Sequence, residues 1–266
     1  MGTKRVLLTG AAGRLGSAVR AQLRDHVALL RVSDVAPMDP ARPGEEVIQC
    51  DLGDYAGVKQ LCRGVDAIVH LGAEARETSW PRLTAGNIVG TINLYEGARK
   101  AAVERVLFAS SITAVGFYRS RTTVDHTSAP RPDGRYSSTK AFGEHLAVMY
   151  AYKHAIRGFV MRLGACRPKP TDSSILPIWL SYGDLARLVV VGLTADYRFE
   201  VVYGLSQSTC STFDNSNAFR LGYAPLDRSS DYADKVPHKA PPTVIDAEFK
   251  GSFASTLYSG SIDWPP

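Results

Sequence analysis

The stretch that decides the fold is Arg5-Val6-Leu7-Leu8-Thr9-Gly10-Ala11-Ala12-Gly13-Arg14-Leu15-Gly16, an apolar run that ends in a turn with three glycines. The run predicts a buried strand, and the apolar residues after the turn predict a helix. Gly10 allows a tight exit from the strand, Gly13 lets the backbone approach a pyrophosphate, and Gly16 permits close packing of helix on strand. The N-terminus of that helix would face the anion. The order strand, glycines, helix therefore predicts a dinucleotide site, with a plain tight turn as the alternative.

A second strand is predicted over residues 28–34, and it ends in an acid. Asp34 lies 18 residues after Gly16, where a carboxylate can hydrogen-bond the ribose hydroxyls of adenosine. The same carboxylate would repel a 2′-phosphate, so we expect NAD rather than NADP. An aspartate that simply ends a strand in a turn is the alternative. At the glycine turn, the residues expected to contact the cofactor are Gly10, Ala12, Gly13, Arg14, Leu15 and Gly16.

Apolar runs alternate with helix-like segments along most of the chain. This alternation predicts an α/β fold with a doubly wound parallel sheet, whose ligand lies across the carboxyl ends of the strands. The C-terminal end carries few periodic signals, and its prolines indicate an irregular tail. Further strands are predicted at 46–50, 67–71, 105–109, 158–163 and 199–203, with helices at 55–62, 83–102, 136–152 and 184–191.

Tyr136 and Lys140 lie four residues apart at the start of one of these predicted helices. This spacing places both side chains on one face, about one turn apart. A nearby ammonium favours the phenolate and lowers the pKa of a tyrosine from its usual value of about 10. The pair would then act as a general base toward an alcohol. A chance pair on a solvated helix face is the alternative.

Two serines, Ser110 and Ser111, follow the predicted strand at 105–109 and place hydroxyls at its carboxyl end, where a cleft is expected. His70 lies within an apolar strand without a metal partner in the sequence, and we interpret it as a core histidine. Small residues follow it at Gly72 and Ala73, which suits a strand end that passes under a cofactor.

Composition and charge argue against several other classes of protein. The 266 residues are 45% hydrophobic and 21% charged, as is ordinary for a globular protein. The net charge is +5 but the arginines are scattered, so no nucleic-acid partner is expected. The four cysteines lack metal-ligand spacing, so no metal is expected. Without a signal peptide or a long apolar run, we expect no membrane partner and a reducing, cytoplasmic location.

Taken together, these features resemble the extended branch of the short-chain dehydrogenase/reductase family over most of the chain. A closer resemblance is to bacterial NAD-dependent uronate dehydrogenases, which oxidise the anomeric carbon of galacturonate and glucuronate to a lactone. The branch is indicated by Gly10-x-x-Gly13-x-x-Gly16, Asp51-Leu52, His70-Leu71-Gly72-Ala73, Asn87, Ser110-Ser111, Tyr136-x-x-x-Lys140 and Leu221-Gly222-Tyr223-x-Pro225. The closer group is indicated by Thr9-Gly10-Ala11-Ala12-Gly13, Gln49-Cys50-Asp51-Leu52, Phe108-Ala109-Ser110-Ser111, Ala129-x-Arg131-Pro132-Asp133-Gly134 and Asp214-Asn215-Ser216.

The resemblance implies a single Rossmann-type domain over residues 1–266, in which roughly 164–266 form a small C-terminal substrate lobe and tail. It implies that Ser111, Tyr136 and Lys140 are catalytic. It also implies a cofactor side made, beyond the glycine turn, of Asp34, Asp51, Leu52, Leu71, Gly72, Ala73, Asn87, Tyr136 and Lys140.

The chain departs from the uronate dehydrogenases where the sugar is expected to bind. Ile112-Thr113 stands where those enzymes carry Asn-His, and Ala75 and Ala165 stand where they carry serine. Ser174 stands in place of an arginine that grips the sugar carboxylate, a strong and geometrically specific contact. Arg76, Arg119 and Arg167 are candidate replacement cations. The expected substrate-binding set is therefore Ala75, Arg76, Ser111, Ile112, Thr113, Tyr136, Ala165, Arg167 and Ser174.

Three functions are compatible with these residues. The first is an NAD-dependent dehydrogenase acting on C1 of a monosaccharide, which is a uronate, a sulfosugar or a neutral aldose. The second is a nucleotide-sugar epimerase or dehydratase, the more common activity of the extended branch. The third is a non-catalytic NAD-sensing protein, which would not need all three of Ser111, Tyr136 and Lys140. We expect a sugar as the small-molecule partner and a homo-oligomeric assembly.

Overall fold

The computed structural model describes residues 4–261. Within this range the main sheet has seven strands in the order β3-β2-β1-β4-β5-β6-β9, and each neighbouring pair is parallel. The order reverses beside β1, which creates the crevice where doubly wound sheets bind ligands. The predicted α/β fold is confirmed. The strands are β1 (Arg5–Thr9), β2 (Leu29–Asp34), β3 (Glu45–Gln49), β4 (Ala67–His70), β5 (Arg105–Ser111), β6 (Arg157–Leu163) and β9 (Phe199–Gly204).

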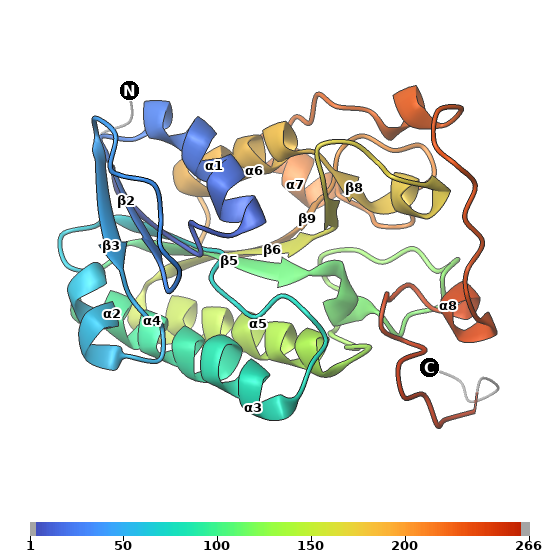
Figure 1. Ribbon diagram of the computed structural model, residues 1–266, viewed down its shortest axis with the longest axis horizontal. Coiled ribbons are helices and arrows are strands. Elements are labelled where there is room, and N and C mark those ends of the chain that lie inside the picture. Colours follow the sequence, from blue (N-terminus) through green and yellow to red (C-terminus); the bar gives the residue numbers. More distant parts are fainter. Residues whose placement is uncertain (1–3, 262–266) are drawn as a thin grey trace.

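Helices cover both faces of this sheet (Figure 1). One layer contains α1 (Arg14–Leu23) and α6 (Tyr182–Thr194), which pack against each other. The other contains α2 (Tyr55–Leu61), α4 (Gly90–Lys100) and α5 (Arg135–His154). A short 3-10 turn, η1 (Arg24–His26), follows α1.

Alternate residues of the central strands, such as β1, point into separate apolar cores. Val6 and Leu8 belong to the core beneath α1 and α6, whereas Leu7 belongs to the core beneath α2, α4 and α5. Side chains alternate across a strand, so burial on both faces requires a continuous apolar run. This is why the runs that predicted the strands lack polar alternation.

The segment predicted as one helix over 83–102 is divided in the structure. Helix α3 (Trp80–Leu83) leads into a π-helical turn, η2 (Thr84–Val89), before α4 begins at Gly90. π-Helical turns are rare in proteins, and those that occur are often found at functional sites. Gly90 packs closely against Leu52, because a Cβ built on Gly90 would lie only 2.8 Å from the Cβ of Leu52. The apolar periodicity of the sequence did not reveal this division, because the three segments are consecutive and all helical.

Residues after Gly164 contribute to the fold in two ways. Helix α6 and strand β9 complete the layers of the main sheet. The other elements are shorter: β7 (Ala165–Cys166), η4 (Ser173–Ile178), β8 (Trp179–Leu180), α7 (Ser216–Arg220), η5 (Ser229–Tyr232) and α8 (Val244–Glu248). Helix α7 contacts β9, whereas β8 and α8 lie toward the end to which the β5 arrow points (Figure 1). Residues 262–266 of the expected lobe lie outside the described residues.

A third apolar cluster joins this region to the end of β5. It contains Ile112 and Val115 of the 3-10 turn η3 (Ile112–Val115), together with Tyr203, Leu205 and Phe213. Among residues 4–261, no helix is long and apolar enough to span a membrane.

Candidate active site

The turn between β1 and α1 has the geometry that its glycines predicted. Gly10 has a φ of +72°, a left-handed conformation that favours glycine. A Cβ on Gly16 would lie 2.0 Å from the carbonyl oxygen of Gly10, so helix and turn can approach this closely only without a side chain. Gly13, the N-cap of α1, supplies no side-chain hydrogen bond to the helix. The first N–H groups of α1 therefore remain available to an anion.

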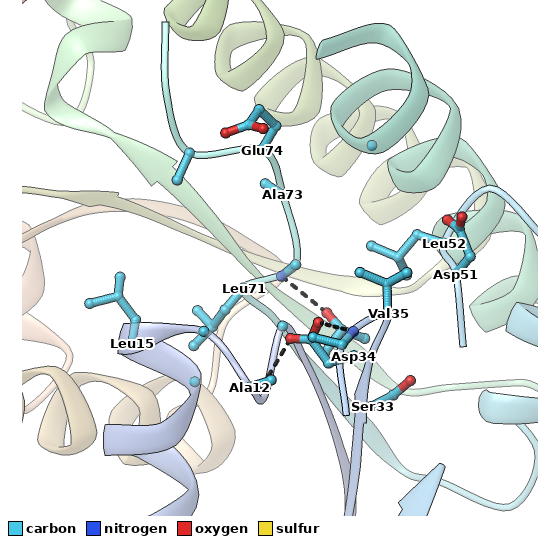
Figure 2. Close-up of a pocket in the computed structure, with 18 of the residues that line it drawn as sticks. Ala12, Leu15, Ser33, Asp34, Val35, Asp51, Leu52, Leu71, Ala73 and Glu74 are labelled. Carbon is cyan, nitrogen blue, oxygen red and sulfur yellow. Dashed lines mark hydrogen bonds between the residues drawn. The ribbon is translucent and has the colours of Figure 1, made fainter. Parts of the chain in front are cut away.

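A cleft of about 930 Å³ opens at this turn, across the carboxyl ends of the strands (Figure 2). Twelve of the residues predicted to contact a cofactor line it: Gly10, Ala12, Gly13, Arg14, Leu15, Gly16, Asp34, Asp51, Leu52, Leu71, Gly72 and Ala73. Ala75 and Arg76, predicted on the sugar side, line it too. Glu74, expected beside Ala75 and Arg76, lines the cleft as well. Six further lining residues were not predicted, and most of them directly neighbour predicted residues in the sequence: Thr9, Ser33, Val35, Ala36, Cys50 and Gly86.

Asp34 is fixed at the end of β2 by two backbone hydrogen bonds. Its Oδ2 accepts from the N–H of Ala12 at 2.9 Å, and its Oδ1 accepts from the N–H of Ala36 at 3.0 Å. Figure 2 shows the first of these bonds joining the carboxylate to the glycine turn. Each carboxylate oxygen keeps a further lone pair for a hydroxyl. The carboxylate thus lies where the sequence analysis placed the ribose contact, and a 2′-phosphate would meet its negative charge.

Both N–H hydrogens of the Asn87 amide, in the π-helical turn, and one lone pair of its oxygen form hydrogen bonds within the protein. Its Oδ1 accepts from the N–H of Glu74 at 2.8 Å, and its Nδ2 donates to the carbonyl of Glu74 and to Oγ1 of Thr139 at 3.0 and 2.9 Å. Asn87 is buried and does not line the cleft. It instead ties the Glu74 end of the cleft to α5, the helix that carries Tyr136 and Lys140.

Tyr136 and Lys140 share one face of α5, as their spacing predicted. Lys140 Nζ lies 5.5 Å from the centre of the Tyr136 ring and 5.3 Å from that of Phe108. Lys140 is only 5% exposed, and within residues 4–261 its Nζ contacts these two rings and no hydrogen-bond acceptor. A buried ammonium without an acceptor suits a site that a polar ligand completes.

The pKa values of this pair differ from the sequence-based expectation. Burial lowers the pKa of Lys140 to about 8, and burial raises the pKa of the Tyr136 phenol. Both shifts have one cause, because removal from water disfavours the charged form of either group. Lys140 therefore does not lower the pKa of Tyr136 in the protein alone. Near neutral pH the phenol is protonated, and the ammonium loses its proton only slightly above neutrality.

Ser111 ends β5 and caps the turn η3. Its Oγ accepts from the N–H of Thr113 at 3.1 Å and from Oγ1 of Thr113 at 2.8 Å. A hydroxyl has two acceptor lone pairs and one hydrogen. With both lone pairs occupied, the hydrogen of Ser111 is the part of this group that remains for a ligand.

A buried ion pair lies next to the residues that are predicted to be catalytic. Arg162 of β6 donates from Nε and Nη2 to the carboxylate of Glu144 at 3.0 and 2.8 Å, and the two side chains are 2% and 6% exposed. Ser110, next to Ser111, donates to the same carboxylate at 2.5 Å. Glu144 lies one turn after Lys140 on α5. This network therefore joins the strand that carries Ser111 to the helix that carries Tyr136.

The other residues predicted on the sugar side occupy different environments. Ile112 is buried in the third apolar cluster. Ala165 lies in β7, and the carbonyl of Arg167 accepts from Trp179 Nε1 at 2.8 Å. Ser174 is exposed, and both its N–H and its hydroxyl donate to Asp172. The residues predicted to be catalytic or substrate-binding that do not line the 930 Å³ cleft are Ser111, Ile112, Thr113, Tyr136, Lys140, Ala165, Arg167 and Ser174.

His70 is a core residue, as interpreted from the sequence. It is 2% exposed, and its Nδ1 lies 2.7 Å from the hydroxyl oxygen of Thr9. Burial, and to a smaller extent the positive charge of the nearby Lys140, lowers the pKa of its imidazole to about 3. The ring is therefore neutral. Within residues 4–261 no group of three His, Cys, Asp or Glu side chains is arranged to hold a metal ion.

The strand order, the glycine turn and the acid at the end of β2 define a Rossmann-type dinucleotide-binding protein, and the serine, tyrosine and lysine place it among short-chain dehydrogenases/reductases. The chain belongs to the NAD dependent epimerase/dehydratase family, whose sequence pattern matches residues 6–195.

Two relatives and one solved structure are similar over most of the chain. The uronate dehydrogenase of Pseudomonas putida is 41% identical over 244 residues, which cover 91% of each chain. The NAD-dependent glucose-6-phosphate dehydrogenase of Haloferax volcanii is 34% identical and covers 85% of this chain and 95% of its own. The crystal structure of uronate dehydrogenase from Agrobacterium tumefaciens has a TM-score of 0.90 and 36% identity, with 96% of this chain and 97% of that chain covered.

Proposed function

We propose that this chain is an NAD-dependent dehydrogenase that oxidises the C1 hydroxyl of a monosaccharide to a lactone. The observation that carries the proposal is the position of Tyr136 and Lys140. They share one face of α5, which Asn87 ties to the Glu74 end of the dinucleotide cleft. The similarity to relatives named as dehydrogenases of free sugars favours this function over a nucleotide-sugar epimerase or an NAD sensor.

The residues present fit NAD. The uncapped start of α1 suits the pyrophosphate, Asp34 suits the adenosine ribose, and the unpartnered ammonium of Lys140 suits a ribose hydroxyl of the nicotinamide half. When bound, NAD accepts the hydride that leaves C1.

In this proposal, the protein handles the proton and the orientation of the sugar. Ser111 donates its free hydrogen to the C1 oxygen, because Thr113 occupies its lone pairs. The C1 hydroxyl then donates its own hydrogen toward Tyr136, which takes the proton as the C1–H bond breaks and C1 becomes the lactone carbonyl. Burial raises the pKa of Tyr136 in the protein alone, so the phenolate needs the positive charge of Lys140 and of the oxidised cofactor.

The substrate is a monosaccharide whose far end is not held by a cation at position 174. Ser174 supplies no charge there, and its donors are engaged by Asp172. A hydrogen bond to a charged group contributes about 1.5–3 kcal/mol, so this loss weakens a carboxylate sugar about ten- to a hundredfold at that position. Arg76, which is exposed in the cleft, is the candidate for a differently placed anion.

The test is the initial rate of NADH formation with galacturonate, glucuronate, galactose, glucose, glucose 6-phosphate and a 6-sulfonated glucose. NADH should form with at least one of these free sugars, and the two hexuronates should not have the highest kcat/KM. A clear preference for a hexuronate would overturn the argument from Ser174. No NADH with any free sugar would overturn the dehydrogenase proposal.

Assembly and location complete the proposal. Helices α4 and α5 pack together, and they and η2 carry exposed apolar side chains. These are Val89, Ile92, Val148, Met149 and Tyr152. A second copy of the chain that covers them gives the expected homo-oligomer, which light scattering would detect as a multiple of 28.8 kDa.

The four free cysteines suit the reducing cytoplasm. We treat residues 1–266 as one domain, with 164–266 supplying the substrate lobe.

A further inference from the structure

The catalytic helix α5 is capped by a carboxylate from a distant part of the chain. Glu77 lies on the loop between β4 and α3 and is partly buried. Its Oε1 accepts from the N–H of Arg135 at 3.1 Å, and its Oε2 accepts from the N–H of Tyr136 at 2.8 Å. The N-cap of α5 itself, Gly134, makes no side-chain hydrogen bond to the helix. Glu77 thus satisfies two of the free N–H groups at the start of α5.

Gly134 provides the space for this contact. A Cβ on Gly134 would lie 2.7 Å from Oε2 of Glu77. Its φ of −166° is an extended conformation that any residue adopts, so a side chain here would displace the Glu77 carboxylate without straining the backbone. The glycine and the glutamate, 57 positions apart in the sequence, form one fitted contact.

A second connection links the same loop to the other side of Tyr136. The N–H of Glu74 donates to Asn87, whose Nδ2 donates to Oγ1 of Thr139. That hydroxyl donates in turn to the carbonyl of Tyr136 at 2.7 Å. The backbone N–H of Tyr136 is held by Glu77 and its carbonyl by a chain that ends at Glu74. The loop is therefore joined to the backbone of Tyr136 on both sides.

The loop segment between these two anchors contains Ala75 and Arg76, which line the cleft. We propose that Glu77 is a positioning residue that makes the cleft-lining loop and Tyr136 one rigid unit. A sugar that contacts the loop at Ala75 or Arg76 is then held at a fixed distance from the phenol oxygen. The role in turnover rests on the proposed dehydrogenase function, whereas the mechanical coupling of loop and helix does not.

The test compares Glu77→Ala and Glu77→Gln with a matched loss of a helix cap elsewhere. Asp54 caps α2 by accepting from the N–H of Ala56 at 3.0 Å, so Asp54→Ala removes a similar bond from a helix that lacks catalytic residues. In Glu77→Ala we expect kcat to fall at least tenfold, because Tyr136 loses its fixed position, while the Kd for NADH changes less than twofold. Glu77→Gln keeps one acceptor oxygen and should recover part of kcat. A kcat for Glu77→Ala no lower than that of Asp54→Ala would overturn the proposal.

Hydrogen exchange gives a readout that does not depend on the substrate. In the Glu77→Ala protein, peptides that contain residues 135–139 and residues 74–76 should both exchange faster, because the loop and the helix lose their common anchor. In Asp54→Ala both peptides should keep wild-type protection. If the wild-type protein oxidises no sugar, the proposed dehydrogenase function is refuted. The coupling of loop and helix is still tested by hydrogen exchange in that case. Unchanged protection of residues 74–76 in Glu77→Ala would overturn it.

Discussion

Replacing Lys140 with methionine should stabilise the protein in the absence of NAD. Lys140 is 5% exposed, and burial lowers its pKa from 10.5 to about 8. The folded protein therefore binds this proton less tightly than the unfolded chain. At pH 7 both states are protonated, and the folded state carries the full cost of a buried ammonium. The difference between the two pKa values corresponds to about 3 kcal/mol.

The sign of the pH dependence follows from the same values. As the pH rises from 8 to 10.5, the folded state releases the proton of Lys140 while the unfolded state keeps it. The unfolded state then binds more protons, so the stability of the wild-type protein rises with pH in this window. Methionine has a similar length and no charge. The Lys140→Met protein should be more stable by up to about 3 kcal/mol at pH 7, and this advantage should shrink toward pH 10.5.

Urea unfolding of both proteins without NAD, at several pH values between 7 and 10.5, measures this difference. Comparing the two proteins at each pH cancels the other titrating groups. Lys153→Met is the control, because Lys153 is exposed on the same helix and its loss should change stability little. A Lys140→Met protein that is no more stable than wild type at pH 7, or an advantage that stays constant with pH, would refute the reasoning.

Three further predictions concern turnover. Tyr136→Phe should nearly abolish NADH formation and leave the Kd for NADH unchanged, since only the proton acceptor is lost; rapid turnover would contradict its role. Asp34→Ala should reduce the preference for NAD over NADP in kcat/KM, and a wild-type protein that binds NADP more tightly would show that the ribose assignment is wrong. Thr113→Val should lower kcat/KM about two- to tenfold, as expected for the loss of one neutral hydrogen bond to Ser111, whereas Thr113→Ser should restore it. Equal rates for the valine and serine variants would argue against that orientation of Ser111.

The fold and most of the lining of the cleft could be predicted from the sequence because their signals are local. The glycine turn is readable since Gly10 needs a left-handed backbone and Gly16 needs close packing. The apolar strands are readable because burial on both faces leaves no polar alternation. Asp34 lies at the end of a strand that pairs with β1, so its place beside the glycine turn follows from strand order alone.

The substrate side was harder because its contacts join distant parts of the chain. Nothing near Ile112 indicates that it packs with Phe213 in an apolar cluster, or that Asp172 engages Ser174. The resemblance placed Asn87 on the cofactor side, and no local signal indicated that its amide bonds Glu74 and Thr139. The pKa of Tyr136 depends on how deeply it is buried, which a spacing of four residues does not reveal.

The buried pair of Glu144 and Arg162 restricts how this sequence can evolve. Losing one partner leaves an uncompensated buried charge, which costs about 3–5 kcal/mol, whereas replacing both by apolar residues is often neutral. The free energy of unfolding of a domain of this kind is only about 5–15 kcal/mol, so either single substitution would remove a large part of its stability. The two positions should therefore change together or remain fixed among homologues, and Ser110 should change with them. Homologues in which position 144 varies freely beside an unchanged arginine would show that the pair is replaceable one side at a time.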